Sequence, residues 1–202
     1  MKVDLHIHTS ERSYCAGATA QEQIGAALSA GLDAIAITDH GPLVPRDMRR
    51  RWQEKYPGLR ILPGIELSLA EDILVVGLED PRLEADVWTW PELHRFVRER
   101  DGLLVVAHPF RYQSRIGIDC VRYPPDALEA FSINLSPHLA RSIRAEAAQL
   151  GIQVVSNSDA HVTRPIGKYY NRLHHPAVTD VEILTAIRAG QFQVRTPSRS
   201  RV

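Results

Sequence analysis

The sequence is poor in the residues that mark several common classes of protein. Two cysteines in 202 residues are too few for a disulfide framework, which favours a reducing cytoplasm. The chain has 24 basic and 24 acidic residues, so its net charge is zero. This charge gives no reason to expect an anionic membrane or nucleic acid as partner. Aromatic residues make up only 6% of the chain, which leaves few platforms for base stacking. We therefore expect a cytoplasmic protein for which nucleic acid is an open but less favoured partner.

Long apolar segments are also missing. No run approaches the roughly 20 residues that cross a bilayer, so we expect no membrane partner. The length suits a single domain with one substantial core, and neither a repeat nor a linker divides it. We expect one domain over 1–202, in which 196–202, rich in serine and arginine, form a loose tail.

Apolar runs alternate with segments that carry helix signals. Thr19 and Thr179 are each followed three residues later by a glutamate, which is typical of a helix capping box. The apolar runs 34–37 and 103–107 suit strands buried on both faces of a parallel sheet. The run 73–78 reads instead as a hairpin appended to the strand before it. This alternation predicts an α/β fold with a parallel sheet, open or closed into a barrel.

Metal-ligating residues follow five of the apolar runs. His6 and His8 are two residues apart, so a strand projects both imidazoles from one face, while Leu5 and Ile7 face the other side. The carboxyl ends of parallel strands meet at one face, where barrels build their active sites. The residues expected at this face are His6, His8, His40, Glu66, His108, Asp159 and His161.

Seven such groups exceed what one ion needs, which indicates two or three divalent ions bridged by a carboxylate such as Glu66. Histidine and carboxylate ligands accommodate Zn, Mn and Fe alike. Ions about 3.5–4 Å apart lower the pKa of a bridging water and clamp the oxygens of a phosphoryl group. The pattern thus predicts a metal-activated hydroxide that attacks phosphorus in line.

Five segments in this order resemble the motifs of the PHP family, the polymerase and histidinol phosphatase superfamily: 4–9 (DLHIHT), 38–40 (TDH), 64–66 (GIE), 107–109 (AHP) and 158–161 (SDAH). The resemblance implies a distorted, TIM-like (β/α)7 barrel with its metal site at the C-terminal ends of the strands. It also implies phosphoester hydrolysis. By this resemblance a first metal is held by His6, His8, Glu66 and Asp159, a second by Glu66 and His108, and a third by His40 and His161.

The chain departs from the family pattern at two places. Where many relatives have a second-metal histidine after the fifth strand, this chain offers Asn134. In the loop after the opening motif, Glu11, Tyr14 and Cys15 are alternative replacements for the usual aspartate or histidine. Spacing does not choose between these three residues.

Other residues are expected to serve the substrate. Arginine suits the bidentate geometry of phosphate, and Arg12, Arg111 and Arg164 lie in loops expected at the catalytic face. Asp39 is interpreted as a partner that orients a histidine, with a simple turn residue as the alternative. We place Asp39, His40 and His161 in the catalytic group.

These residues predict a metal-dependent phosphoric ester hydrolase, most simply a phosphomonoesterase that acts on a small phosphorylated metabolite or nucleotide. One alternative is a 3′ nuclease-type phosphodiesterase. Another is a non-catalytic barrel whose metals stabilise a binding or scaffold module. Hydrolysis of an amide or lactone by the same activated water stays open, as does the oligomeric state.

Overall fold

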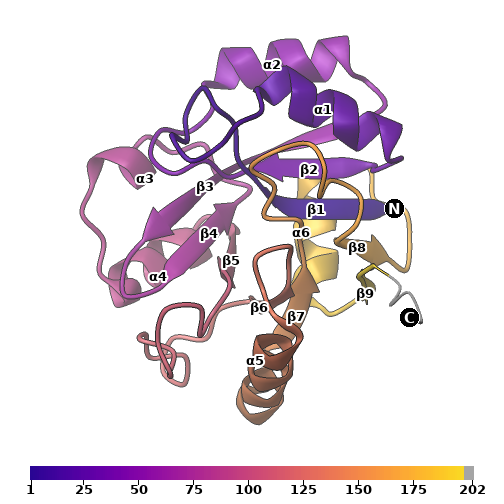
Figure 1. Ribbon diagram of the computed structural model, residues 1–202. Coiled ribbons are helices and arrows are strands. Elements are labelled where there is room, and N and C mark those ends of the chain that lie inside the picture. The colour runs from indigo at the N-terminus through magenta and orange to yellow at the C-terminus, as the bar shows by residue number, and fades with distance from the viewer. Residues whose placement is uncertain (198–202) are drawn as a thin grey trace.

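The computed structural model describes residues 1–197, which form a sheet of nine strands with helices around it (Figure 1). The strand order is β7-β6-β5-β4-β3-β2-β1-β8-β9. The two ends of this order approach each other, since Ser156 of β7 donates its backbone N–H to Asn171 of β8 and its hydroxyl to the carbonyl of Arg195 in β9. The sheet is therefore nearly closed into a barrel. Its strands are β1 (Lys2–Ile7), β2 (Ala34–Ile37), β3 (Arg60–Ser68), β4 (Asp72–Val76), β5 (Leu103–Val106), β6 (Ala127–Phe131), β7 (Gln153–Ser156), β8 (Tyr170–Leu173) and β9 (Phe192–Arg195).

The strands do not all run in one direction. β1, β2 and β3 are parallel, as are β5, β6 and β7, but β4 is antiparallel to both of its neighbours. β8 is antiparallel to β1 and to β9. Residues 69–71 alone join β3 to β4, and a parallel pair needs a crossover of about a dozen residues or more. The α/β, barrel-like fold is confirmed. The regular (β/α)7 arrangement is not, because the expected hairpin is built into the barrel wall.

The opening strand departs from regular alternation. The pairing of β1 with β2 shifts register between Asp4 and Ile7, as a β-bulge does. Leu5 packs in the core inside the barrel, whereas Ile7 packs outside it with the first helix, so the two do not share a face as expected. His6 and His8 nevertheless converge, with their Nε2 atoms 2.9 Å apart.

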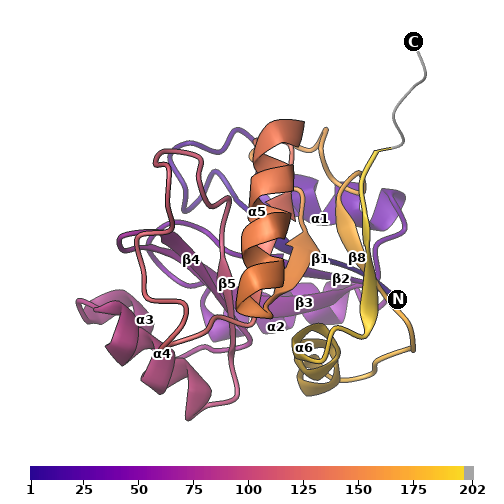
Figure 2. The same cartoon turned by 90° about the horizontal axis from the view of Figure 1, so that it is seen from below.

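Helices enclose the barrel from outside and at one end (Figures 1 and 2). The capping boxes predicted at Thr19 and Thr179 are present at the starts of the first and last helices. Ile183, Leu184 and Ile187 of the last helix join the core inside the barrel and close one end of it. The helices are α1 (Ala20–Ser29), α2 (Arg46–Lys55), α3 (Arg82–Ala85), α4 (Trp90–Arg98), α5 (Pro137–Leu150) and α6 (Asp180–Arg188).

Two expectations concern segments rather than the core. Within residues 1–197, none of the helices has the length and apolarity needed to cross a membrane. Of the expected tail, residues 198–202 lie outside the described part of the chain, and 196 and 197 belong to no helix or strand.

Gly77 tests the closure of the barrel by α6. Its backbone has φ of +93°, and an added Cβ would lie 2.3 Å from Cδ1 of Leu184. We predict that Gly77→Ala lowers the free energy of unfolding by about 1–3 kcal/mol, because it overpacks this contact and strains the backbone. The measurement is the urea midpoint of unfolding. Gly25→Ala is the matched control, since an added Cβ in α1 meets nothing within 4 Å. An unchanged midpoint for Gly77→Ala would contradict the prediction.

Candidate metal centre

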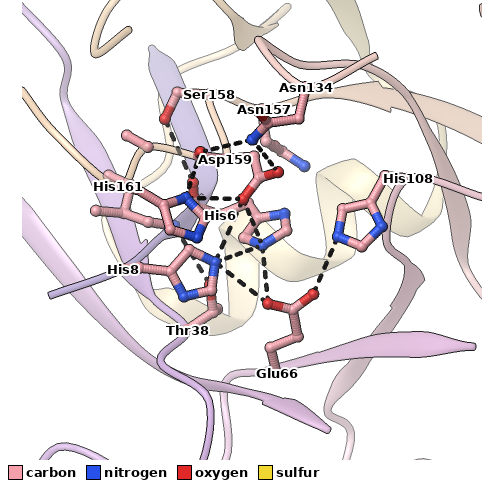
Figure 3. A network of polar contacts seen from close by, with 12 residues as sticks. His6, His8, Thr38, Glu66, His108, Asn134, Asn157, Ser158, Asp159 and His161 are labelled. Carbon is pink, nitrogen blue, oxygen red and sulfur yellow. Dashed lines mark hydrogen bonds and ion pairs between the residues drawn. The ribbon is translucent and has the colours of Figure 1, made fainter. Parts of the chain in front are cut away.

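The seven residues expected at one face do gather there, at the end of the barrel that α6 leaves open. We call this open end the rim. His6 and His8 come from β1 and its end, Glu66 from β3, and the other four from the segments that follow β2, β5 and β7. Figure 3 shows His6, His8, His161 and Asp159 converging, with Glu66 below them and His108 approaching Glu66 from the far side. Each strand thus delivers its ligand to a common centre.

Four of these side chains make a tight, fully buried group. The Nε2 atoms of His6 and His8 lie 2.9 Å apart, and each is 3.2 Å from Oε2 of Glu66. Oδ1 of Asp159 lies 3.4 Å from Nε2 of His6 and 3.3 Å from Nε2 of His8. The exposed fraction of all four side chains is 1% or less.

Hydrogen bonds behind the imidazoles fix which nitrogen carries the proton. Nδ1 of His6 lies 3.0 Å from Oε1 of Glu129, a carboxylate that only accepts, so this nitrogen donates. Nδ1 of His8 lies 3.3 Å from the Ser13 hydroxyl, whose own proton goes to Asp39 at 2.7 Å. When each ring is neutral, its proton is therefore on Nδ1 and its Nε2 presents a lone pair to the centre, as it does when an imidazole ligates a metal.

The donor set fits a divalent cation. Two imidazole lone pairs face each other and two carboxylates, an arrangement that repels unless a positive charge lies among them. Glu66 Oε1 and Asp159 Oδ1 are buried atoms without a hydrogen-bond donor among the described residues. Nitrogen and carboxylate oxygen are common ligands of Zn, Mn and Fe, so the cluster supports the predicted divalent metals.

The electrostatics point the same way. Burial alone would lower the pKa of His6, but the carboxylates of Asp159, Glu129 and Glu66 outweigh it and raise that pKa well above its usual value. Burial would raise the pKa of Glu66, yet the charge of His6 and the close imidazoles of His108, His6 and His8 hold it well below the usual range. The centre is thus a strongly negative site that stabilises positive charge.

A second group of histidines forms the outer lip of the centre. The rings of His40 and His161 lie 4.6 Å and 4.3 Å from that of His8, measured between centroids. Burial lowers the pKa of both His40 and His161, which leaves them neutral near pH 7. Their side chains are 33% and 27% exposed, so they face both the buried ligands and solvent.

His108 completes the centre from β5. Its Nε2 lies 3.2 Å from Oε1 of Glu66, on the side of that carboxylate turned away from His6 and His8. Both His108 and Asp159 have positive φ, of 30° and 50°, a strained conformation that often marks functional sites. Glu66 therefore has one oxygen on each side, as a bridging carboxylate requires.

The remaining predicted residues are placed as follows. Asn134 donates to Oδ2 of Asp159 at 2.6 Å, so its amide faces that ligand rather than His108. The Glu11 carboxylate accepts from the backbone N–H of Ala20 at the start of α1, and Tyr14 and Cys15 are exposed side chains of the same loop, with Tyr14 99% exposed.

The arginines and Asp39 take different positions. Arg12 is turned toward the Leu43 carbonyl and Met48, away from the centre, and Arg164 is an exposed residue after His161. Arg111 lies at the centre, with Nη1 3.7 Å from Oδ2 of Asp159. Asp39 is buried and accepts from Thr9 and Ser13, so it reaches His8 only through the Ser13 hydroxyl.

Sequence reasoning missed three residues of the centre. Ser13 links Asp39 to His8, and Glu129 binds His6 from behind. Asp72, at the start of β4, offers a carboxylate oxygen within 4.8 Å of the ligating atoms of Glu66 and His108. Only Glu129 left a signal in the sequence: a charged residue inside an apolar strand is costly unless a partner is buried with it.

Comparisons with known proteins agree with the resemblance inferred from the motifs. A family model described as PHP-associated matches residues 138–192. A probable phosphatase of Edwardsiella ictaluri is 28% identical over 200 residues, which cover 83% of this chain and 81% of that protein. A probable phosphatase of Thermoanaerobacter sp. is 24% identical over 210 residues, which cover 85% of this chain and 83% of that protein.

A solved structure shares the fold. It is a two-domain protein from Bacteroides vulgatus described as containing a predicted PHP-like metal-dependent phosphoesterase, with a TM-score of 0.77 and 14% identity. The match covers 98% of this chain and 65% of that protein, so the chain spans less than two thirds of its length. The resemblance to the PHP family is therefore confirmed.

Cation binding should stabilise the fold measurably. At a concentration about 100 times the dissociation constant, a cation that binds only the folded chain adds about 2.7 kcal/mol. We predict that adding Mn²⁺ or Zn²⁺ to chelator-treated protein raises the melting temperature by roughly 5–10 °C for a chain of this size. Glu66→Gln should lose most of this rise, because it removes the bridging charge. If added cations leave the melting temperature of the parent protein unchanged, the prediction is contradicted.

Glu129 should act through His6. Its carboxylate accepts from Nδ1 of His6, from the Asn157 amide and from the backbone N–H of His108. In Glu129→Gln the amide NH₂ would face one of these three donors, so that hydrogen bond is lost. We therefore predict roughly 10–100-fold weaker cation binding, measured by competition with a chelator. The control is Glu54→Gln, which removes the same charge at an exposed position of α2 and should bind as the parent does. Equal affinity of Glu129→Gln and the parent would be the contrary result.

Proposed function

We propose that the protein is a metal-dependent phosphomonoesterase that hydrolyses a small phosphorylated metabolite or nucleotide. The observation that carries the proposal is the buried convergence of His6, His8, Glu66 and Asp159 at the open end of a PHP-like barrel. Relatives named probable phosphatase cover more than four fifths of the chain, which supports phosphoester chemistry. The reaction proposed is hydrolysis, and the substrate class is carried over from the sequence analysis.

Each ligand has a proposed place. His6, His8, Glu66 and Asp159 would hold a first cation, and Glu66 and His108 a second. His40 and His161, together with His8, would hold a third, since their ligating atoms lie within 4.8 Å of one another. Bound divalent cations supply a water of lowered pKa and positive charge against the phosphoryl oxygens.

The chain's own residues would bind and orient the phosphate. We propose Arg111 for this role, because its guanidinium lies beside Asp159 and 5.1 Å from the ring centroid of Tyr112. Asp39 would be a positioning residue that holds His8 through Ser13. The neutral, partly exposed imidazoles of His40 and His161 would meet the substrate as it enters.

Hydrolysis of a panel of phosphomonoesters with added Mn²⁺ or Zn²⁺ tests the proposal. We predict that Asp159→Asn and His108→Ala each lower kcat/KM by about 100-fold or more, since the charge stabilisation lost amounts to several kcal/mol. His175→Ala, at an exposed site between β8 and α6, should match the parent. Melting curves establish that the variants are folded.

The same assay separates the alternatives. Faster cleavage of a labelled single strand than of mononucleotides would favour a nuclease. Cation binding without hydrolysis of any ester, under any metal, would favour a scaffold. Folded Asp159→Asn and His108→Ala proteins with the parent's rate would overturn the assignment of the site.

A further inference from the structure

The structure assigns Asp72 as a third protein ligand of the second cation, together with Glu66 and His108. This carboxylate would stand in for the histidine that the chain lacks after its fifth strand. The inference rests on the proposed function only in assuming that the centre holds cations, and it concerns the composition of one site rather than the reaction. Four observations carry it.

The direction of β4 brings Asp72 to the rim. Because β4 is antiparallel to β3 and β5, its first residue lies at the end where the parallel strands finish. Asp72 pairs with Ser68, two residues beyond Glu66 along β3, and its carbonyl accepts the backbone N–H of Ala107, the residue before His108. The backbone therefore fixes Asp72 between the two other ligands.

Alternation along β4 turns the side chain of Asp72 inward. Leu74 and Val76 pack in the core inside the barrel, whereas Ile73 and Val75 pack in the outer core under α4 and α5. Asp72 lies two residues before Leu74, so both side chains point to the same face of the sheet. Leu74 lies directly opposite Glu66 in the strand register. The side chains of Asp72 and Glu66 thus lie on the same face of the sheet, one step apart along it.

The ligating atoms are close enough to share one ion. Carboxylate oxygens of Glu66 and Asp72 and a ring nitrogen of His108 all lie within 4.8 Å of one another. Oε1 of Glu66 is a buried atom that lies 3.2 Å from Nε2 of His108, and no donor among the described residues meets it with hydrogen-bond geometry. A buried carboxylate oxygen without such a donor needs another partner, and a cation shared with His108 and Asp72 would supply it.

Neighbouring contacts orient the Asp72 carboxylate. Ser68 donates its hydroxyl to Oδ1 of Asp72 at 2.6 Å, which leaves Oδ2 for a further partner. The adjacent Glu71 accepts the backbone N–H of Gly117 at 2.7 Å and the Gln113 amide, so the loop after β5 is tied to the start of β4. Asn134, the alternative ligand in sequence, is engaged with Asp159 instead.

The second site would have two carboxylates and one imidazole, whereas the first has two carboxylates and two imidazoles. The second site therefore has the higher proportion of oxygen ligands. Oxygen ligands bind Mn²⁺ better than they bind soft metals, so Mn²⁺ is the cation used to test this site. Chelator-treated protein is loaded with Mn²⁺, and the ions per chain are measured by elemental analysis. Electron paramagnetic resonance then shows whether neighbouring Mn²⁺ ions are coupled.

We expect Asp72→Asn to retain one Mn²⁺ fewer per chain than the parent, or to need at least about tenfold more Mn²⁺ to fill that site. The spectral coupling between adjacent ions should fall with it. Asp72→Glu, which keeps the carboxylate, should restore part of the binding. Asp80→Asn is the control, since it removes one negative charge from a half-buried aspartate paired with Arg100.

The outcomes separate this inference from the proposed function. Equal Mn²⁺ content and coupling in Asp72→Asn and the parent, with both folded by melting curve, would overturn the Asp72 site and leave the phosphatase proposal intact. A parent chain that binds only one Mn²⁺ would overturn it as well. A parent that binds coupled ions but hydrolyses no ester would overturn the function and leave the site standing.

Discussion

The centre depends on buried imidazoles and carboxylates that need positive charge among them, which a bound cation or a proton on His6 can supply. Two imidazole nitrogens 2.9 Å apart face two carboxylates, and all four side chains are buried. Such a group opposes folding by itself, because burial without compensation is costly for carboxylates. The barrel tolerates it because its inner core and α6 close the opposite end with apolar contacts. Stability and chemistry are therefore concentrated at opposite ends of the same strands.

Around this centre, a layer of polar residues sets the orientation of each ligand. Glu129 holds His6 and the backbone of His108 at once, and Asp39 acts on His8 through Ser13. All of these partners, the His108 ring included, are nearly or fully buried. The ligands are thus held by the sheet and its first loop rather than by solvent-exposed loops, which suits a site that must keep its geometry between turnovers.

The sequence predicted the gathering of the seven rim residues because each follows an apolar run, and parallel strands end together. The same rule hid Asp72, which begins a strand and reaches the rim only because β4 is reversed. Glu129 was missed because it lies in the middle of β6, and the rule considers only residues at the ends of strands. Arg12 lies in the expected loop, yet its guanidinium turns toward Met48, a choice of rotamer that spacing does not encode. The bulge in β1, which separates Leu5 from Ile7, likewise depends on tertiary pairing.

The position of β1 has a consequence for how the chain acquires its metals during synthesis. The first strand lies between β2 and β8. Its Leu5 N–H donates to Oδ1 of Asn157, 152 residues away, and its Asp4 carboxylate accepts the N–H of Ser158, 154 residues away. Contacts of such sequence separation form late, since a long loop must close before they are made. His6 and His8 leave the ribosome early but meet Asp159 only after most of the chain has emerged. Metal loading would therefore be a late event, because the first site is complete only when β1 has joined the segment that follows β7.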